Sequence, residues 1–158
     1  MWVPFDTLPA HARLWIYGAS QPLDAAQLEP MLKTFATEWT AHRQELQASA
    51  TVYNQYFILL AVNEEVNAAS GCSIDQATRF MLDLGQRMGI NLLERRRYYI
   101  RENLKIVCYE HDAFAQALRD QRLGPHTIVA DTLINKMGDL ASFWKPLGDS
   151  WHRRLFGL

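Results

Sequence analysis

Apolar residues recur along the first two thirds of the chain with two different periods, and the period changes at turn-forming or helix-capping residues. Alternation with a period of two predicts strands, and spacings of three and four residues predict helices that bury one face. Asp24 followed by Gln27, and Ser73 followed by Gln76, are typical of helix starts, whereas Gly89 is typical of a helix end. The elements predicted in order are a strand at 12–19, a helix at about 25–41, strands at 45–53 and 56–62, a helix from the Ser70–Asp75 segment to Gly89, and strands at 97–101 and 104–109.

The order strand, helix, strand, strand, helix, strand predicts an α+β protein with a ferredoxin-like core, the split βαβ arrangement βαββαβ. Such a sheet has the strand order 4-1-3-2, which places the first and third strands in its centre. The segments 12–19 and 56–62 are apolar on both faces, as central strands should be. Because helices cover only one face of the simple fold, the side chains on the other face, to which we assign Trp15 and Tyr17, need a separate cover.

The remaining residues contain enough apolar side chains to provide that cover. The elements predicted there are a helix at 112–122, a strand at 127–131 and a helix at 138–144. We expect a single domain over 1–158, with the ferredoxin-like core at about 10–110 and a C-terminal α/β extension at about 111–158 docked on the open sheet face. A homodimer that buries the same face is the alternative, and the sequence leaves this choice open.

Composition narrows the class of protein. Hydrophobic residues make up 49% of the 158 residues, which is typical of a globular chain. Sixteen basic and seventeen acidic residues give a net charge of -1, so a nucleic-acid partner is not expected. The N-terminus lacks the pattern of a signal peptide, no apolar run is long enough to span a membrane, and Cys72 and Cys108 are too few for a disulfide framework. We therefore expect a cytoplasmic protein with free cysteines and no membrane partner.

The segment Ser70–Asp75 is the strongest candidate for a functional site. It places Cys72 at the start of a helix, where unpaired backbone N–H groups and the helix dipole favour negative charge. In a ferredoxin-like sheet, one edge would bring this cysteine together with residues from the end of the first helix and the ends of the third and fourth strands. The residues predicted at this edge are Trp39, His42, Asn63, Glu64, Glu65, Cys72, Cys108, Glu110 and His111.

Two interpretations of this edge stay open. In the first, Cys72 is a nucleophile, His42 is its general base and Glu64 or Glu65 orients the imidazole. In the second, Ser73 with Gln76 forms a capping box and Cys72 is a small buried side chain. The segment would then belong to a non-catalytic ligand pocket. The residues predicted to bind the ligand are Ser70, Gly71, Ser73, Asp75 and Trp39.

Metal and nucleotide motifs are absent from the sequence. Cysteine and histidine are zinc ligands, but Cys72, Cys108, His42 and His111 show none of the short spacings typical of zinc sites. No P-loop is present, and Gly85–Gly89 does not follow a strand as a dinucleotide fingerprint would. We expect neither a metal nor another cofactor.

Three short motifs carry a resemblance to a known family: Trp39-Thr-Ala-His42, Ser70–Asp75 and Asp149-Ser-Trp-His152. With them the chain resembles a small family of uncharacterised bacterial proteins, some of which are labelled as ABC transporter ATPases. Because the P-loop is absent, the label does not extend to this chain. The chain departs from the family pattern at Arg43, where glycine is expected, and at Asn63, where aspartate is expected. The resemblance implies a bacterial source but no activity.

We expect a small binding or interaction protein without catalytic activity, whose partner is an unknown small ligand or a protein. A cysteine-dependent hydrolase or transferase that uses Cys72 and His42 is the alternative.

Overall fold

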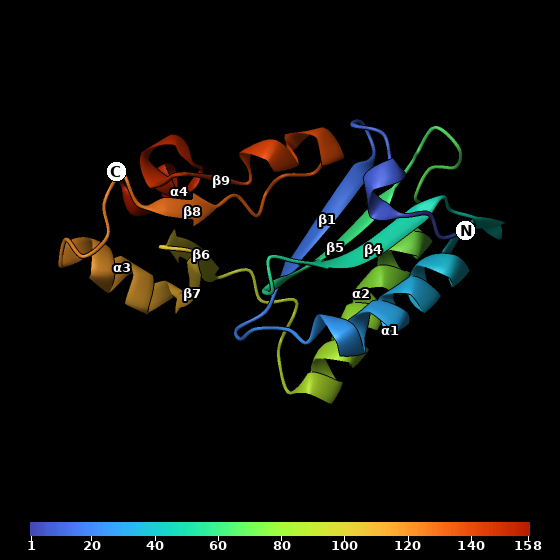
Figure 1. Ribbon diagram of the computed structural model, residues 1–158, viewed down its shortest axis with the longest axis horizontal. Helices are drawn as coiled ribbons and strands as arrows, with labels where there is room; N and C mark the ends of the chain where they lie inside the picture. The colour runs from blue at the N-terminus through green and yellow to red at the C-terminus, as the bar shows by residue number, and fades with distance from the viewer. The chain divides into compact units, whose positions relative to one another are not determined.

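The computed structural model describes residues 1–158 and divides into two compact units, each with its own sheet (Figure 1). The first unit comprises Met1–Leu93 and Ile134–Leu140, and the second comprises Glu94–Leu133 and Ala141–Leu158. Both units combine antiparallel strands with helices, so the α+β class is confirmed.

The first unit is built around a three-stranded antiparallel sheet with the order β1-β5-β4. Its elements are η1 (Phe5–Thr7), β1 (Arg13–Gly18), α1 (Ala25–Glu38), β2 (Thr40–Ala41), β3 (Gln44–Glu45), β4 (Ala48–Tyr53), β5 (Phe57–Val62) and α2 (Gly71–Met88). The central strand β5 pairs Leu60 with Trp15 of β1 on one side and with Ala50 of β4 on the other. All six residues of β5 are buried, which confirms the prediction of a central strand buried on both faces.

Helices α1 and α2 lie side by side on one face of this sheet (Figure 1). Tyr17 and Ile58 belong to the same buried cluster as Leu32 and Met81 of the two helices. The ring of Trp15 contacts that of Trp39 edge-on, with 5.6 Å between the centroids. The assignment of Trp15 and Tyr17 to the face without helices was therefore wrong, since alternation separates the two faces of a strand but does not say which one the helices cover.

Both edges of the sheet are partly covered by short bridges. At the outer edge of β1, Arg13 forms an antiparallel bridge with Lys136, and at the outer edge of β4, Ala48 forms a parallel bridge with Trp2. A carboxylate oxygen of Glu29 in α1 also accepts hydrogen bonds from the hydroxyl of Thr51 and the backbone N–H of Val52. Such contacts occupy groups of edge strands that would otherwise be open to pairing.

The second unit contains a four-stranded antiparallel sheet with the order β7-β6-β8-β9. Its helices and strands are β6 (Arg97–Glu102), β7 (Lys105–Glu110), α3 (His111–Arg119), β8 (Ile128–Ala130), β9 (Trp144–Pro146), η3 (Leu147–Asp149) and α4 (His152–Phe156), and η2 (Met137–Ser142) leads into it. Tyr98 of β6 contacts the rings of Phe114 in α3 and Phe156 in α4, with centroids 4.9 and 5.2 Å away. This aromatic cluster forms part of the core of the second unit.

The predicted strand at 104–109 is found, as β7, but not where the ferredoxin-like order places it. It pairs only with β6, in the sheet of the second unit, instead of lying beside β1. The sheet of the first unit thus has three of the four expected strands, in the expected relative order 1-3-2. The C-terminal residues 141–158, expected as an extension over the core sheet, belong to the second unit, and β9 is a strand where no strand was predicted.

None of the helices is both long and apolar enough to cross a membrane.

Candidate functional site

The start of α2 is capped by hydrogen bonds between Ser70 and Ser73. The hydroxyl of Ser70 accepts a hydrogen bond from the backbone N–H of Ser73 at 3.2 Å, and the hydroxyl of Ser73 accepts one from the backbone N–H of Ser70 at 2.6 Å. This reciprocal pair is a capping box. It uses Ser73 where the sequence suggested Gln76, because Ser70 and not Ser73 is the N-cap residue.

Trp39 joins the end of α1 to the start of α2. The buried indole N–H of Trp39 donates a hydrogen bond of 2.8 Å to the main-chain carbonyl of Ser73, and its carbonyl accepts one from the backbone N–H of Leu46. Trp39 therefore lies next to the Ser70–Asp75 segment, as predicted, but its polar atom is already paired within the protein.

The side chains of Cys72, the proposed nucleophile, and His42, its proposed base, form no hydrogen bond or ion pair. Cys72 is exposed in the first turn of α2, so the interpretation of Cys72 as a buried side chain was wrong. His42 is exposed at the tip of the hairpin between β2 and β3, where both His42 and Arg43 have positive φ angles of 52° and 65°. These angles define the tight turn that joins the two short strands.

Glu64 and Glu65, the two carboxylates predicted to orient His42, both contact other residues. One oxygen of Glu64 accepts a hydrogen bond from the backbone N–H of Ala69 at 3.1 Å and lies 3.7 Å from the guanidinium of Arg13. Its neighbour Glu65 lies 3.2 Å from an imidazole nitrogen of His11. Glu64 thus fixes the backbone that leads into Ser70, and the structure gives it no contact with His42.

The residues expected from the fourth strand lie in the second unit. The strand β7 belongs to the sheet of the second unit. Cys108, Glu110 and His111 therefore do not share a sheet edge with Cys72, as the ferredoxin-like order required. Burial raises the pKa of the Cys108 thiol to about 11, with the Arg97 guanidinium opposing the shift. Such a thiol is a weak nucleophile at neutral pH.

A groove of about 320 Å³ lies between α1 and α2, one turn beyond the capping box. The rings of Phe35 and Phe80 stack in it with 4.4 Å between centroids and 14° between planes. The residues that line it are Phe35, Glu38, Trp39, Gln76, Arg79, Phe80 and Asp83. Of the residues predicted to bind a ligand, Trp39 lines this groove, and Ser70, Gly71, Ser73 and Asp75 do not.

The rim of the groove carries unpaired charges. Glu38 and Asp83 contribute two carboxylates and Arg79 contributes one guanidinium, and none of the three forms an ion pair. The sequence does not single out these residues, because the helical spacing assigns Phe35 and Phe80 to the core. The charged residues one turn away were the only signal, and most helices have such residues on the solvent side.

The structure contains no group of three or more histidine, cysteine, aspartate or glutamate residues arranged to hold a metal ion. Comparison of the chain with protein-family models, curated proteins and solved structures finds no match.

Proposed function

We propose that this protein is a non-catalytic binding protein whose ligand occupies the groove between α1 and α2. The observation that carries the proposal is the stacked pair Phe35 and Phe80, which leaves apolar ring surface in a groove bordered by unpaired charges. Binding sites of this kind combine an apolar floor with a few polar groups that orient the ligand.

The charges indicate the chemistry of the ligand. Two carboxylates and one guanidinium leave the rim with a net negative charge. A small ligand that combines a flat apolar group with a positive charge would place its ring against Phe35 and Phe80 and its charge beside Glu38 or Asp83.

The proposal is tested with two probes that share a phenyl ring, 2-phenylethylamine and 3-phenylpropionate, followed by NMR on the isotope-labelled protein. We expect the amine to shift the signals of Gln76 and Phe80 saturably and the acid to leave them unchanged. The Glu38→Gln/Asp83→Asn variant should weaken amine binding. The Asp6→Asn/Glu45→Gln variant changes the same total charge at exposed positions outside the groove and should not. Equal shifts from both probes, or equal weakening in both variants, would contradict the proposal.

A cysteine-dependent hydrolase or transferase is the second candidate, and the exposure of Cys72 at the start of an 18-residue helix favours it. The two candidates differ in the reactivity of this thiol. If the protein is a binding protein, iodoacetamide should alkylate Cys72 at pH 7 at a rate within a few-fold of that of an unstructured cysteine peptide. A rate more than about tenfold higher would favour the enzyme.

We further propose that the first unit is a variant of the ferredoxin-like fold. Its sheet keeps the relative order 1-3-2, and the segment around Lys136 lies antiparallel at the edge of β1 where the fourth strand would be. The backbone N–H of Leu14 donates to the carbonyl of Asn135 at 2.9 Å, and that of Met137 donates to the carbonyl of Ala12 at 3.0 Å. A homodimer, the bacterial source and the cytoplasmic location stay predictions.

A further inference from the structure

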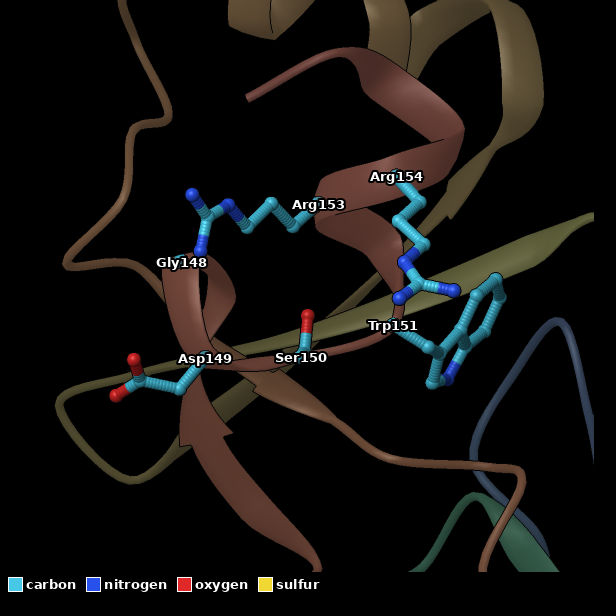
Figure 2. A pocket seen from close by; sticks show the side chains of 6 residues that line it. All are labelled: Gly148, Asp149, Ser150, Trp151, Arg153 and Arg154. Carbon is cyan, nitrogen blue, oxygen red and sulfur yellow. The ribbon is translucent and has the colours of Figure 1, made fainter.

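A second cavity lies within the second unit, at residues that the proposed function does not use. It has a volume of about 370 Å³ and lies between the turn that follows β9 and the short helix α4 (Figure 2). It includes three residues of the motif Asp149-Ser-Trp-His152 noted in the sequence. The residues that line it are Gly148, Asp149, Ser150, Trp151, Arg153 and Arg154.

Both arginines of the cavity have unused hydrogen-bond donors. Neither Arg153 nor Arg154 forms an ion pair. The Nε–H of Arg153 donates to the main-chain oxygen of Leu158 at 3.0 Å, which holds this side chain in place, and its two terminal nitrogens make no hydrogen bond within the protein. Figure 2 shows the guanidinium of Arg153 above Gly148 and that of Arg154 beside the indole of Trp151.

The floor of the cavity is held by a chain of hydrogen bonds. The hydroxyl of Ser150 donates to the main-chain carbonyl of Leu147 at 2.8 Å and lies 3.0 Å from Nδ1 of His152. Since the hydroxyl proton is used on Leu147, the bond to His152 is completed by an Nδ1–H that donates to Ser150. Ser150 therefore holds the turn, and the side-chain donors available to a ligand are those of the arginines.

The only acidic side chain of the cavity does not neutralise them. The carboxylate of Asp149 forms no ion pair with Arg153 or Arg154, and in Figure 2 it points away from both guanidinium groups. Two basic side chains thus line the cavity, against one acidic side chain. The whole chain, by contrast, carries a net charge of -1.

We propose that this cavity binds a small molecule that carries a phosphate group, with the guanidinium of Arg153 donating hydrogen bonds to the phosphate and that of Arg154, beside the indole of Trp151, contributing a second positive charge. A guanidinium presents paired N–H donors whose geometry matches two oxygens of a phosphate, and such charge-assisted hydrogen bonds are among the strong ones. The cavity is larger than a phosphate ion needs, and the indole of Trp151 offers flat apolar surface to the rest of the ligand.

The test uses three probes, namely glycerol 3-phosphate, inorganic phosphate and glycerol, with NMR detection of Gly148, Ser150 and Trp151 in the full chain. Both phosphates should shift these signals saturably, whereas glycerol should not. The Arg153→Gln/Arg154→Gln variant should bind glycerol 3-phosphate about tenfold more weakly or worse, as expected for the loss of charge-assisted hydrogen bonds. Succinate serves as the carboxylate probe, and its binding as tightly as phosphate would overturn the assignment to phosphate.

The matched control is Arg119→Gln/Arg122→Gln, which removes the same charge from exposed arginines outside the cavity. This control should change the affinity less than twofold. Equal weakening in both variants, or no saturable shift with millimolar phosphate, would overturn the proposal, because binding would then be absent or would follow net charge alone.

Two single variants keep the test independent of any effect on folding. Arg154→Gln leaves the contact between Arg153 and Leu158 in place, and it should still weaken binding. Asp149→Asn removes the negative charge at the border and should tighten binding a few-fold. An Asp149→Asn variant that binds no more tightly than the unmodified protein would count against a phosphate held at this place.

Discussion

The indole N–H of Trp39 donates a hydrogen bond of 2.8 Å to the carbonyl of Ser73, and this bond ties the end of α1 to the first turn of α2. Trp39 is 1% exposed and contacts the rings of Trp15 and Phe35. The residue that borders the groove is thus also a fixed point of the core. The groove is consequently formed by the packing of two helices rather than by a loop.

Replacement of Trp39 by phenylalanine should lower the free energy of unfolding by about 1–3 kcal/mol, because the hydrogen bond is lost and a smaller ring leaves a gap. Urea unfolding measures this. Trp151→Phe is the matched control, since the buried indole N–H of Trp151 has no hydrogen-bond partner and its removal costs no hydrogen bond. If Trp39→Phe were no less stable than Trp151→Phe, the hydrogen bond to Ser73 would not contribute as described.

Local sequence patterns predicted the main helices and strands of the first unit and the relative order of its three strands. They did not predict the sheet to which β7 belongs. Its partners depend on contacts far away in sequence, such as those of Tyr98 in β6 with Phe156 in α4, 58 positions later. Alternation shows that a segment can be a strand, but not which edge it joins.

The candidate sites likewise combine local features, which the sequence predicts, with long-range features, which it does not. A helix start within Ser70–Asp75 follows from local spacing, although its N-cap residue is Ser70 and not Ser73. The position of Trp39 beside it was predicted from the expected arrangement of helices and strands. The groove at Phe35 and Phe80 depends on how closely two helices approach, and periodicity alone assigns both residues to the core. The cavity at Arg153 depends on where a turn returns beside a short helix, for which the sequence carries no short-range signal.

Gly85→Ala should destabilise the protein, although alanine is the better helix former by about 1 kcal/mol. A Cβ at Gly85 would clash with the carbonyl oxygen of Ile90, and this backbone must shift to accept it. We expect a net loss of about 1–3 kcal/mol, typical of overpacking. Gly71→Ala is the control because a Cβ there meets no atom within 4 Å. Thermal unfolding of the two variants compares them directly, and equal midpoints would show that the backbone at Ile90 yields easily.

Arg43→Gly should stabilise the protein. Arg43 has a φ of 65°, in the left-handed region that costs other residues about 1–2 kcal/mol more than glycine. Part of this gain is offset because glycine has more freedom in the unfolded chain, so we expect a net increase of about 0.5–1 kcal/mol. Arg43→Ala removes the same side chain but leaves a residue with a Cβ at the positive φ. In urea unfolding it should show no increase in the free energy of unfolding. A similar gain in both variants would assign the effect to the loss of the arginine side chain.

His152 should make the second unit sensitive to acid. Burial lowers the pKa of His152 to about 4 from the ordinary value of 6.5, with the carboxylate of Asp131 opposing the shift. Below pH 6.5 the unfolded chain takes up a proton that the folded protein does not, so the stability contributed by neutral His152 is complete above pH 6.5 and is lost as the pH falls toward 4. The difference between the two pKa values corresponds to about 3 kcal/mol at most.

The measurement is the free energy of unfolding of the unmodified protein and of His152→Gln from pH 7 to pH 4. The variant is expected to be less stable at pH 7, because the stacking on Trp151 is lost. As the pH is lowered, its stability should nevertheless fall less steeply than that of the unmodified protein. The variant lacks the buried imidazole, whereas its carboxylates are the same. His126→Gln, at an exposed position of the same unit, should follow the unmodified protein. Parallel curves for His152→Gln and the unmodified protein would show that His152 is protonated in the folded state as readily as in the unfolded chain.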